Sequence, residues 1–81
     1  MAPQTTIRQA TSADAFALRR LAALDDRAAL RGSVLLAEQA GEVRAALSLD
    51  NGRSIANPFA PTAALVEMLR AQSRQLETVA A

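Results

Sequence analysis

The fold is decided by residues 43–61, which read VRAALSLDNGRSIANPFAP. Residues 43–50 alternate with period two, which predicts a strand whose apolar face carries Val43, Ala45, Leu47 and Leu49. Asn51-Gly52 predicts a type I′ hairpin turn, because both residues accept positive φ angles at little cost. Arg53 to Asn57 is then the returning strand, and Pro58 ends it. The stretch predicts a hairpin whose last strand leads through a Pro58–Pro61 loop towards a helix.

Two further strands are expected upstream. Thr6 to Ala10 is a short β-leaning segment, typical of an edge strand. Ser33 to Gln39 is mostly apolar and has the length of a strand that is buried on both faces. Gly41 supplies the permissive residue of a tight turn between this strand and the next. Residues 33–57 therefore form a three-strand meander.

Two helices flank the meander. Thr11 or Ser12 offers an N-cap oxygen for a helix from Ala13 to about Arg27, and Gly32 provides a positive φ in the exit after it. After Pro61, Thr62 is the expected N-cap of a second helix. The apolar stripe of this second helix consists of Leu65, Val66, Leu69, Leu76 and Val79.

These elements define a fold class. The order β-α-β-β-β-α predicts an α+β fold, with a mixed sheet of about four strands and two helices that cover one of its faces. The 81 residues form one domain, residues 1–81, in which residues 1–5 and 79–81 are expected to be flexible. A domain of this size buries a modest share of its surface, so association is a common source of added stability.

Composition excludes several kinds of chemistry. The chain has no cysteine and no histidine, so thiolate nucleophiles, disulfides and the commonest metal ligands are ruled out. Lysine, tyrosine and tryptophan are also missing. All nine basic residues are arginines, a bias typical of bacterial genomes rich in GC. No metal site is expected.

Charge and hydropathy point to a cytoplasmic protein. Nine arginines against eight acidic residues give a net charge of +1, which favours a mixed solvated surface. With Phe16 and Phe59 as the sole aromatic residues, nucleic-acid binding is not expected. No apolar run approaches the ~20 residues that span a bilayer, and the N-terminal residues lack the features of a secretory signal.

Two charged pairs in the first helix are candidates for a site. Arg19-Arg20 could contact a phosphate, but such a pair is far more often solvated helix surface. Asp25-Asp26 could act as paired carboxylates, but consecutive helical positions diverge by about 100°, so these two do not converge on one site.

Three strings resemble the GNAT acetyltransferase family. TIRQATSADA, at residues 6–15, is similar to the family's first strand and helix entry, often written I-R-x-A-x-x-x-D. VLLAEQAGEVRAALSL, at residues 34–49, resembles its central hairpin with the pattern A-E-x-x-G. IANPF, at residues 55–59, resembles the end of the strand that leads into the acetyl-CoA loop. The resemblance implies the N-terminal half of a GNAT fold over nearly the whole chain.

The same resemblance has a departure at its cofactor loop. The family follows this strand with a Q/R-x-x-G-x-G/A loop whose amides hold the pyrophosphate of acetyl-CoA. Here residues 59–64 read FAPTAA, without glycine and with Pro61 removing one amide donor. The strands that complete the family's cofactor cleft, and a catalytic tyrosine, are not in the sequence. The resemblance therefore implies a GNAT-like half domain with no catalytic residues and no cofactor.

The first functional hypothesis is protein association, most simply as a homodimer. Half of a GNAT sheet leaves a strand edge exposed, and natural proteins rarely leave such an edge unprotected. Arg53 to Asn57 is the candidate pairing strand, with the second helix across the seam.

The second hypothesis keeps acetyl-CoA, another acyl-CoA or an anion at the start of the second helix. Thr62, Ala63 and Ala64 would supply a hydroxyl and two amides there. If the protein were an N-acetyltransferase, Glu38 or Glu42 would be the candidate general base, acting through a water.

The third hypothesis is a small regulatory protein that binds a partner enzyme or nucleic acid through clustered arginines. It requires one face to carry the following set: Arg8, Arg19, Arg20, Arg44 and Arg53.

Overall fold

The computed structural model describes residues 4–80, with the side chains of residues 77–80 left out. Its elements are, in order: β1 (Thr5–Gln9), a 3-10 turn (Ser12–Asp14), α1 (Ala15–Leu24), β2 (Val34–Gln39), β3 (Glu42–Ser48), β4 (Ser54–Ala56) and α2 (Ala63–Ala80). This confirms the expected order and the α+β class. Of the residues expected to be flexible, Thr5 belongs to β1 and α2 continues to Ala80, while residues 1–3 and 81 lie outside the described part.

The sheet is antiparallel throughout, so the expectation of a mixed sheet was wrong. Its strand order over residues 4–80 is β1-β2-β3-β4, and each neighbouring pair is antiparallel. Hairpins join β2 to β3 and β3 to β4. The chain after α1 returns to the end of β1, where the Ala10 N–H donates to the Val34 carbonyl (2.8 Å), so β2 runs back along β1. β1 and β4 are therefore the two edges.

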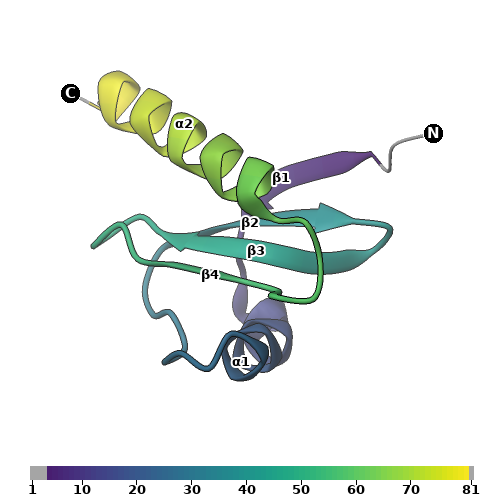
Figure 1. The fold of residues 1–81 in the computed structure, drawn as a ribbon. Coiled ribbons are helices and arrows are strands. Elements are labelled where there is room, and N and C mark those ends of the chain that lie inside the picture. Colours follow the sequence, from purple (N-terminus) through teal and green to yellow (C-terminus); the bar gives the residue numbers. More distant parts are fainter. Residues whose placement is uncertain (1–3, 81) are drawn as a thin grey trace.

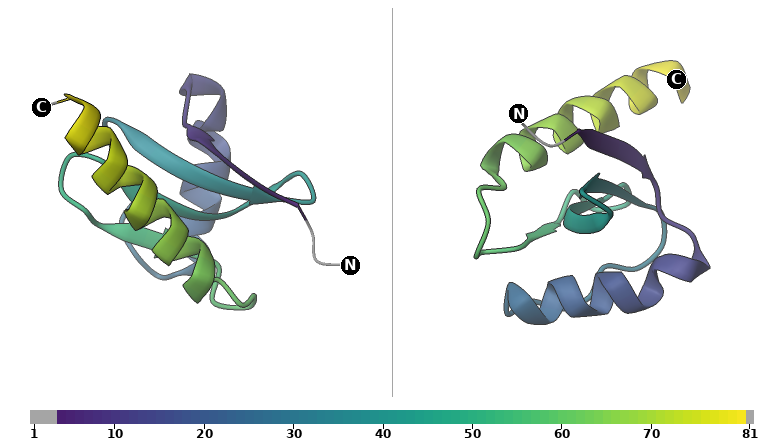
Figure 2. Two further views of the ribbon diagram at one scale, coloured as in Figure 1. Left: turned by 90° about the horizontal axis from the view of Figure 1, so that it is seen from above. Right: turned by 90° about the vertical axis from the view of Figure 1, so that its right-hand side faces the viewer.

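The helices lie on opposite faces of the sheet, which corrects the expectation that both cover one face (Figures 1 and 2). The cause is in β2 and β3, where apolar side chains point both ways. Leu36 and Ala46 pack with α1, whereas Leu35 and Leu47 pack with α2. A strand that is apolar on both faces needs cover on both.

Two apolar cores result. The core under α1 is formed by Leu18, Leu21, Ala22, Leu30, Val34, Leu36, Ala46 and Ile55. The core under α2 is formed by Leu35, Ala37, Ala45, Leu47, Leu65 and Leu69. Of the stripe predicted for the second helix, Leu65 and Leu69 are buried, Leu76 is exposed, and the side chain of Val79 lies outside the described part.

A β-bulge reverses one side chain of the predicted apolar face. The register shifts between Ala37 and Glu38, so Ala37 pairs with Ala45 but Glu38 pairs with Val43. The extra residue on β3 turns Val43 to the α1 face, away from Ala45 and the α2 core. The strict alternation expected for residues 43–50 was wrong at this end of the strand.

The turn at Asn51-Gly52 exists but is not type I′. Among its residues only Gly52 has a positive φ (75°). The Gly52 N–H donates to the Ser48 carbonyl (3.0 Å), and the Ser48 hydroxyl accepts from the Asp50 and Asn51 amides. The turn is therefore closed by a hydrogen bond between residues four apart, as in one turn of an α-helix, and the buried Ser48 supplies both of its acceptor groups.

The segment around α1 follows its expected capping. The Thr11 hydroxyl accepts from the Ala13 amide (3.3 Å), and Asp14 completes the capping box. The helix ends at Leu24, about three residues earlier than expected, and Asp26 then takes a positive φ (52°). Gly32 also has the expected positive φ, and a Cβ there would collide with the Asp50 carboxylate.

Candidate functional site: the two edges of the sheet

The β1 edge presents an open row of backbone groups. The bond from Ala10 to Val34 sets the alternation, so Thr6 and Arg8 bond to β2 while Thr5, Ile7 and Gln9 direct their N–H and C=O groups outward. Among the described residues, only the Gln9 carbonyl in this row gains a partner, a long contact from Arg8 (3.4 Å). β1 therefore offers an unpaired strand edge.

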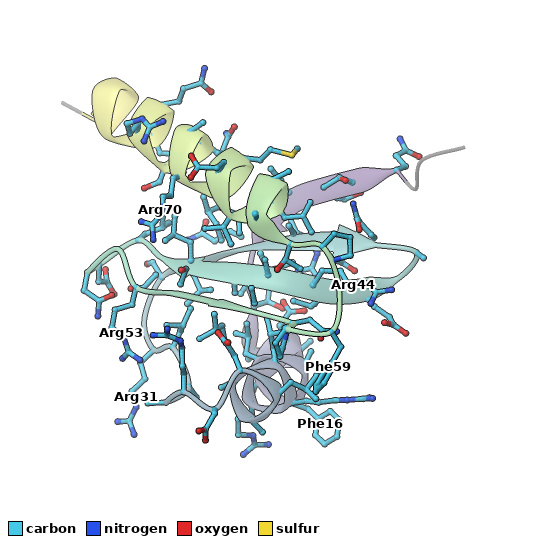
Figure 3. The ribbon with its side chains drawn as sticks, in the orientation of Figure 1. Phe16, Arg31, Arg44, Arg53, Phe59 and Arg70 are labelled. Atoms are coloured by element: carbon cyan, nitrogen blue, oxygen red, sulfur yellow. The ribbon has the colours of Figure 1, made fainter. Side chains whose placement is uncertain are left out.

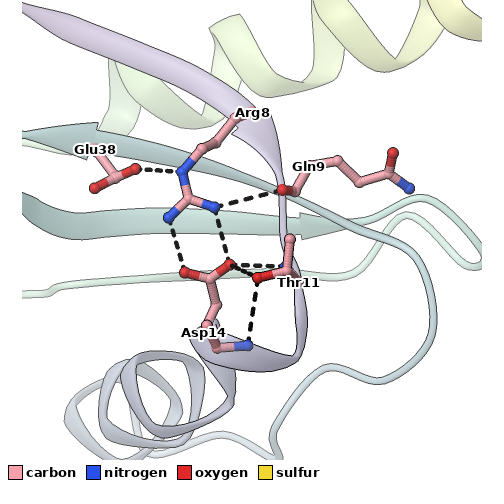
Figure 4. A network of polar contacts seen from close by, with 6 residues as sticks. Arg8, Gln9, Thr11, Asp14 and Glu38 are labelled. Atoms are coloured by element: carbon pink, nitrogen blue, oxygen red, sulfur yellow. Dashed lines mark hydrogen bonds and ion pairs between the residues drawn. The ribbon is translucent and has the colours of Figure 1, made fainter.

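A network of polar contacts anchors β1 from the α1 face (Figure 4). The Arg8 guanidinium donates to both oxygens of Asp14, at 2.9 and 2.8 Å, and its Nε donates to Glu38 on β2. Asp14 also accepts from the Thr11 amide (2.7 Å). One arginine thus ties the edge strand to its neighbour and to the start of α1.

The network shifts the titration of both partners. The hydrogen bond from Arg8, followed by that from the Thr11 amide, holds the pKa of Asp14 well below its ordinary value. The bonds to Asp14 and Glu38 raise the already high pKa of Arg8 further. The ion pair is therefore charged across the physiological pH range.

The β4 edge is partly covered by side chains. Its ladder with β3 leaves Ser54 and Ala56 with outward backbone groups. The Asp25 carboxylate, just after α1, accepts from the outward Ala56 N–H (3.0 Å). From the opposite side Arg70 of α2 donates to the Gly52 carbonyl (3.1 Å) and to the Ser54 hydroxyl (3.4 Å). Side chains from both faces of the sheet thus reach this three-residue edge, and its Ser54 N–H stays outward without a partner among the described residues.

A hollow of about 360 Å³ lies along the β4 edge, between the end of α1 and α2. Its lining consists of Asp25, Arg27, Gly52, Arg53, Ser54, Ala56 and Arg70. We call it the basic hollow. Figure 3 shows Arg70 on one side of the β3–β4 turn and Arg53 on the other.

The first residue before α2, Thr62, is bonded to the preceding loop and to the first turn of the helix. The Thr62 hydroxyl donates to the Asn57 carbonyl (3.4 Å), and the Thr62 carbonyl accepts from Val66. Ala63 and Ala64 are exposed. The hydroxyl expected to contact an anion is therefore oriented towards the preceding loop.

The candidate general bases are held by arginines. Glu38 is bound by Arg8, and the exposed Glu42 pairs with Arg44 at 3.3 Å. Within the described residues, no three acidic side chains gather as a metal ion would require.

The arginines expected to share one face are dispersed. Arg8 is bound in its network, Arg19 and Arg20 lie on α1, and Arg44 and Arg53 lie at opposite ends of the meander in Figure 3. Arg53 instead lines the basic hollow with Arg27 and Arg70. Arg27, Arg53 and Arg70 come from three separate segments: the loop after α1, the β3–β4 turn and α2. No local sequence pattern predicts that these segments lie next to one another.

Some large apolar side chains outside β1 and β4 are also exposed. Phe16 on α1 is 70% exposed and Phe59, after β4, is 82% exposed. Phe16 borders a second hollow of about 310 Å³ that also reaches Arg8 and Glu38. No helix within residues 4–80 combines the length and apolarity needed to cross a bilayer.

A scan against protein-family models found no match, and searches of curated proteins and of solved structures found none either. The GNAT resemblance accordingly stays a prediction from the three strings.

Proposed function

We propose that this chain is a non-catalytic, GNAT-like half domain that acts by protein association, forming a homodimer in which β1 of one copy pairs with β1 of another. The observation that carries the proposal is the contrast between β1, a five-residue edge whose outward N–H groups all lack a partner among the described residues, and β4, a three-residue edge whose Ala56 N–H is taken by Asp25 and whose turn is covered by Arg70. This moves the pairing strand from Arg53–Asn57, the segment favoured by the sequence, to residues 5–9.

An antiparallel pair centred on Ile7 is self-complementary. The outward groups of Ile7 would meet those of the partner subunit's Ile7, and Thr5 would meet the partner subunit's Gln9, once on each side of a two-fold axis. Every outward N–H of β1 would then have a carbonyl opposite. The Gln9 carbonyl can keep its contact from Arg8, since a carbonyl has two lone pairs.

The charges of β1 agree with this register. Arg8 is its one ionisable residue, and in the Ile7-centred pair it lies opposite the partner subunit's Thr6. Like charges directly opposite each other would destabilise the pair, and this register avoids them. Asp14 and Glu38 further offset the charge of each Arg8.

Catalysis is not part of the proposal. The glutamates considered as general bases are engaged with Arg8 and Arg44, and the Thr62 hydroxyl is directed to Asn57. These contacts support a scaffold in which polar groups hold the edge strands.

Sedimentation of the full chain at micromolar concentration tests the proposal. We expect a mass of twice 8.5 kDa. Gln9→Pro removes an outward N–H from an exposed position and should raise the dissociation constant about tenfold or more, since each dimer loses two hydrogen bonds. Ser54→Pro is the matched control at the other edge and should leave the dissociation constant unchanged. A monomeric mass for the wild type, or equal effects of the two prolines, would overturn the proposal.

A further inference from the structure

The basic hollow beside β4 is separate from the proposed dimer edge. Because the strand order is β1-β2-β3-β4, the hollow and the β1 edge lie on opposite sides of the sheet. A ligand in the hollow would therefore bind whether or not the chain forms the dimer.

The charge of the hollow is strongly one-sided. Three guanidinium groups line it, from Arg27, Arg53 and Arg70, against the single carboxylate of Asp25. That carboxylate is already engaged, because it accepts from the Ala56 N–H (3.0 Å) and lies 3.4 Å from Arg27 Nε. The excess of positive charge therefore stays available to a ligand.

Arg70 is the best-positioned of the three cations. It donates to a main-chain carbonyl and to a hydroxyl, both neutral, so its orientation is set while its charge is not cancelled. Arg53 forms no side-chain hydrogen bond or ion pair with any residue in the described range. The Ser54 N–H points out from the same edge as a further donor.

This donor set defines the ligand chemistry. Guanidinium groups and an amide, arranged around one space, suit an anion with several acceptor oxygens. Donors that approach from the α1 side, the turn and α2 match the three free oxygens of a phosphate better than the two of a planar carboxylate. A volume of about 360 Å³ is at the lower end for small-molecule sites.

A nucleic-acid strand fits less well. Single-stranded binding relies on aromatic side chains that stack with bases along a basic track. In the view of Figure 3, Phe16 and Phe59 are both placed well away from Arg53 and Arg70. We propose that the basic hollow binds a small molecule carrying a phosphate group, through Arg53, Arg70 and the Ser54 amide, with Arg27 at its rim.

An NMR titration of the full chain tests this site, with inorganic phosphate, glycerol phosphate and acetate as probes. We expect saturable shifts of the Ser54 amide and the Arg70 side chain with both phosphates, and weaker binding of acetate. Arg70→Gln should weaken phosphate binding about tenfold, the size expected for one charge-assisted contact. Arg19→Gln removes the same charge from an exposed site on α1 and should leave the affinity within about twofold.

Three other results would overturn the proposal, either at the site or at its ligand. Shifts that never saturate, or equal weakening by Arg70→Gln and Arg19→Gln, would show general attraction of anions to the surface. Acetate binding as tightly as phosphate would overturn the phosphate assignment. A short single-stranded oligonucleotide that binds far more tightly than glycerol phosphate would replace the small-molecule ligand with nucleic acid. The thermal midpoint of Arg70→Gln is measured as well. If it equals that of the wild type, the weaker phosphate binding of this variant is not caused by a loss of stability.

Discussion

The two edge strands of this sheet are protected in opposite ways. β4 is three residues long, and its outward Ala56 N–H is taken by Asp25 while Arg70 covers the adjoining turn. β1 is five residues long, and its outward row is open although Arg8 anchors the strand firmly from one face. Anchoring a strand and closing its edge are therefore separate tasks. This chain anchors both strands, but side chains cover part of the edge only at β4.

The largest expected difference between the edges is in how each central isoleucine is buried. Ile55 of β4 is 1% exposed in the α1 core, whereas Ile7 of β1 is only partly buried beside the α2 core. Ile55→Ala should lower the free energy of unfolding by about 3–4 kcal/mol. Ile7→Ala should cost about 1 kcal/mol in the dilute monomer.

Urea denaturation of both variants measures this difference. If Ile55→Ala does not fold, Ile55→Val provides the comparison, with an expected loss of about 1 kcal/mol. Equal losses for the two alanine variants would contradict the view that β4 is the better anchored edge.

The next effect concerns the closure of β4. Asp25→Ala leaves the Ala56 N–H without its acceptor and should cost about 1–2 kcal/mol of stability. Asp25→Asn keeps an acceptor oxygen at the same place, so its loss should be smaller. Denaturant curves for the pair measure the effect, and an asparagine variant as unstable as the alanine variant would count against the bond.

The anchor of β1 is tested through its pH dependence. Asp14→Asn removes the ion pair with Arg8, and we expect the thermal midpoint at pH 7 to fall by about 5 °C. Because the folded-state pKa of Asp14 is depressed, its contribution is complete above the unfolded value of about 4 and is lost as the pH falls towards the folded value.

The midpoints of wild type and Asp14→Asn should therefore converge as the pH is lowered from 7 to about 2. Thermal melts across that range, followed by circular dichroism, measure the gap. A gap that keeps its size at acid pH would show that Asp14 stabilises β1 by something other than its charge.

The smallest effects are expected at the exposed aromatic residues. Phe16→Ala and Phe59→Ala should change stability by less than about 0.5 kcal/mol, since both side chains are mostly in solvent. They should also leave the dimer mass unchanged, because neither residue belongs to β1. A monomeric mass for either variant would move the association surface from the β1 edge to these side chains.

Local chemistry predicted the elements well. Thr11 capped the start of the first helical segment as expected, and the meander follows from its apolar runs and its glycines. The apolar run of β2 already indicated burial on both faces. The sequence did not predict that one helix covers each face of β2. The helices α1 and α2 have similar apolar stripes, so neither pattern shows which face of the sheet its helix covers.

Long-range contacts were beyond reach of the sequence. Asp25 lies 31 positions before Ala56. From the sequence it was considered only together with Asp26, as a possible pair of carboxylates. The bulge that reverses Val43 has no local sequence signature. It arises from the pairing of two strands, where the register shifts between Ala37 and Glu38. The difference between the edges is made of such contacts, so the sequence favoured β4 for pairing, whereas these contacts underlie our proposal of β1.

Concentration-dependent amide hydrogen exchange tests the central claim most directly. The Ile7 and Gln9 amides point outward from β1, as the Ser54 amide does from β4. We expect Ile7 and Gln9 to become protected as protein concentration rises through the dimer range, while exchange at Ser54 stays the same. Exchange at Ile7 and Gln9 that is independent of concentration, or protection gained at Ser54 instead, would contradict pairing through β1.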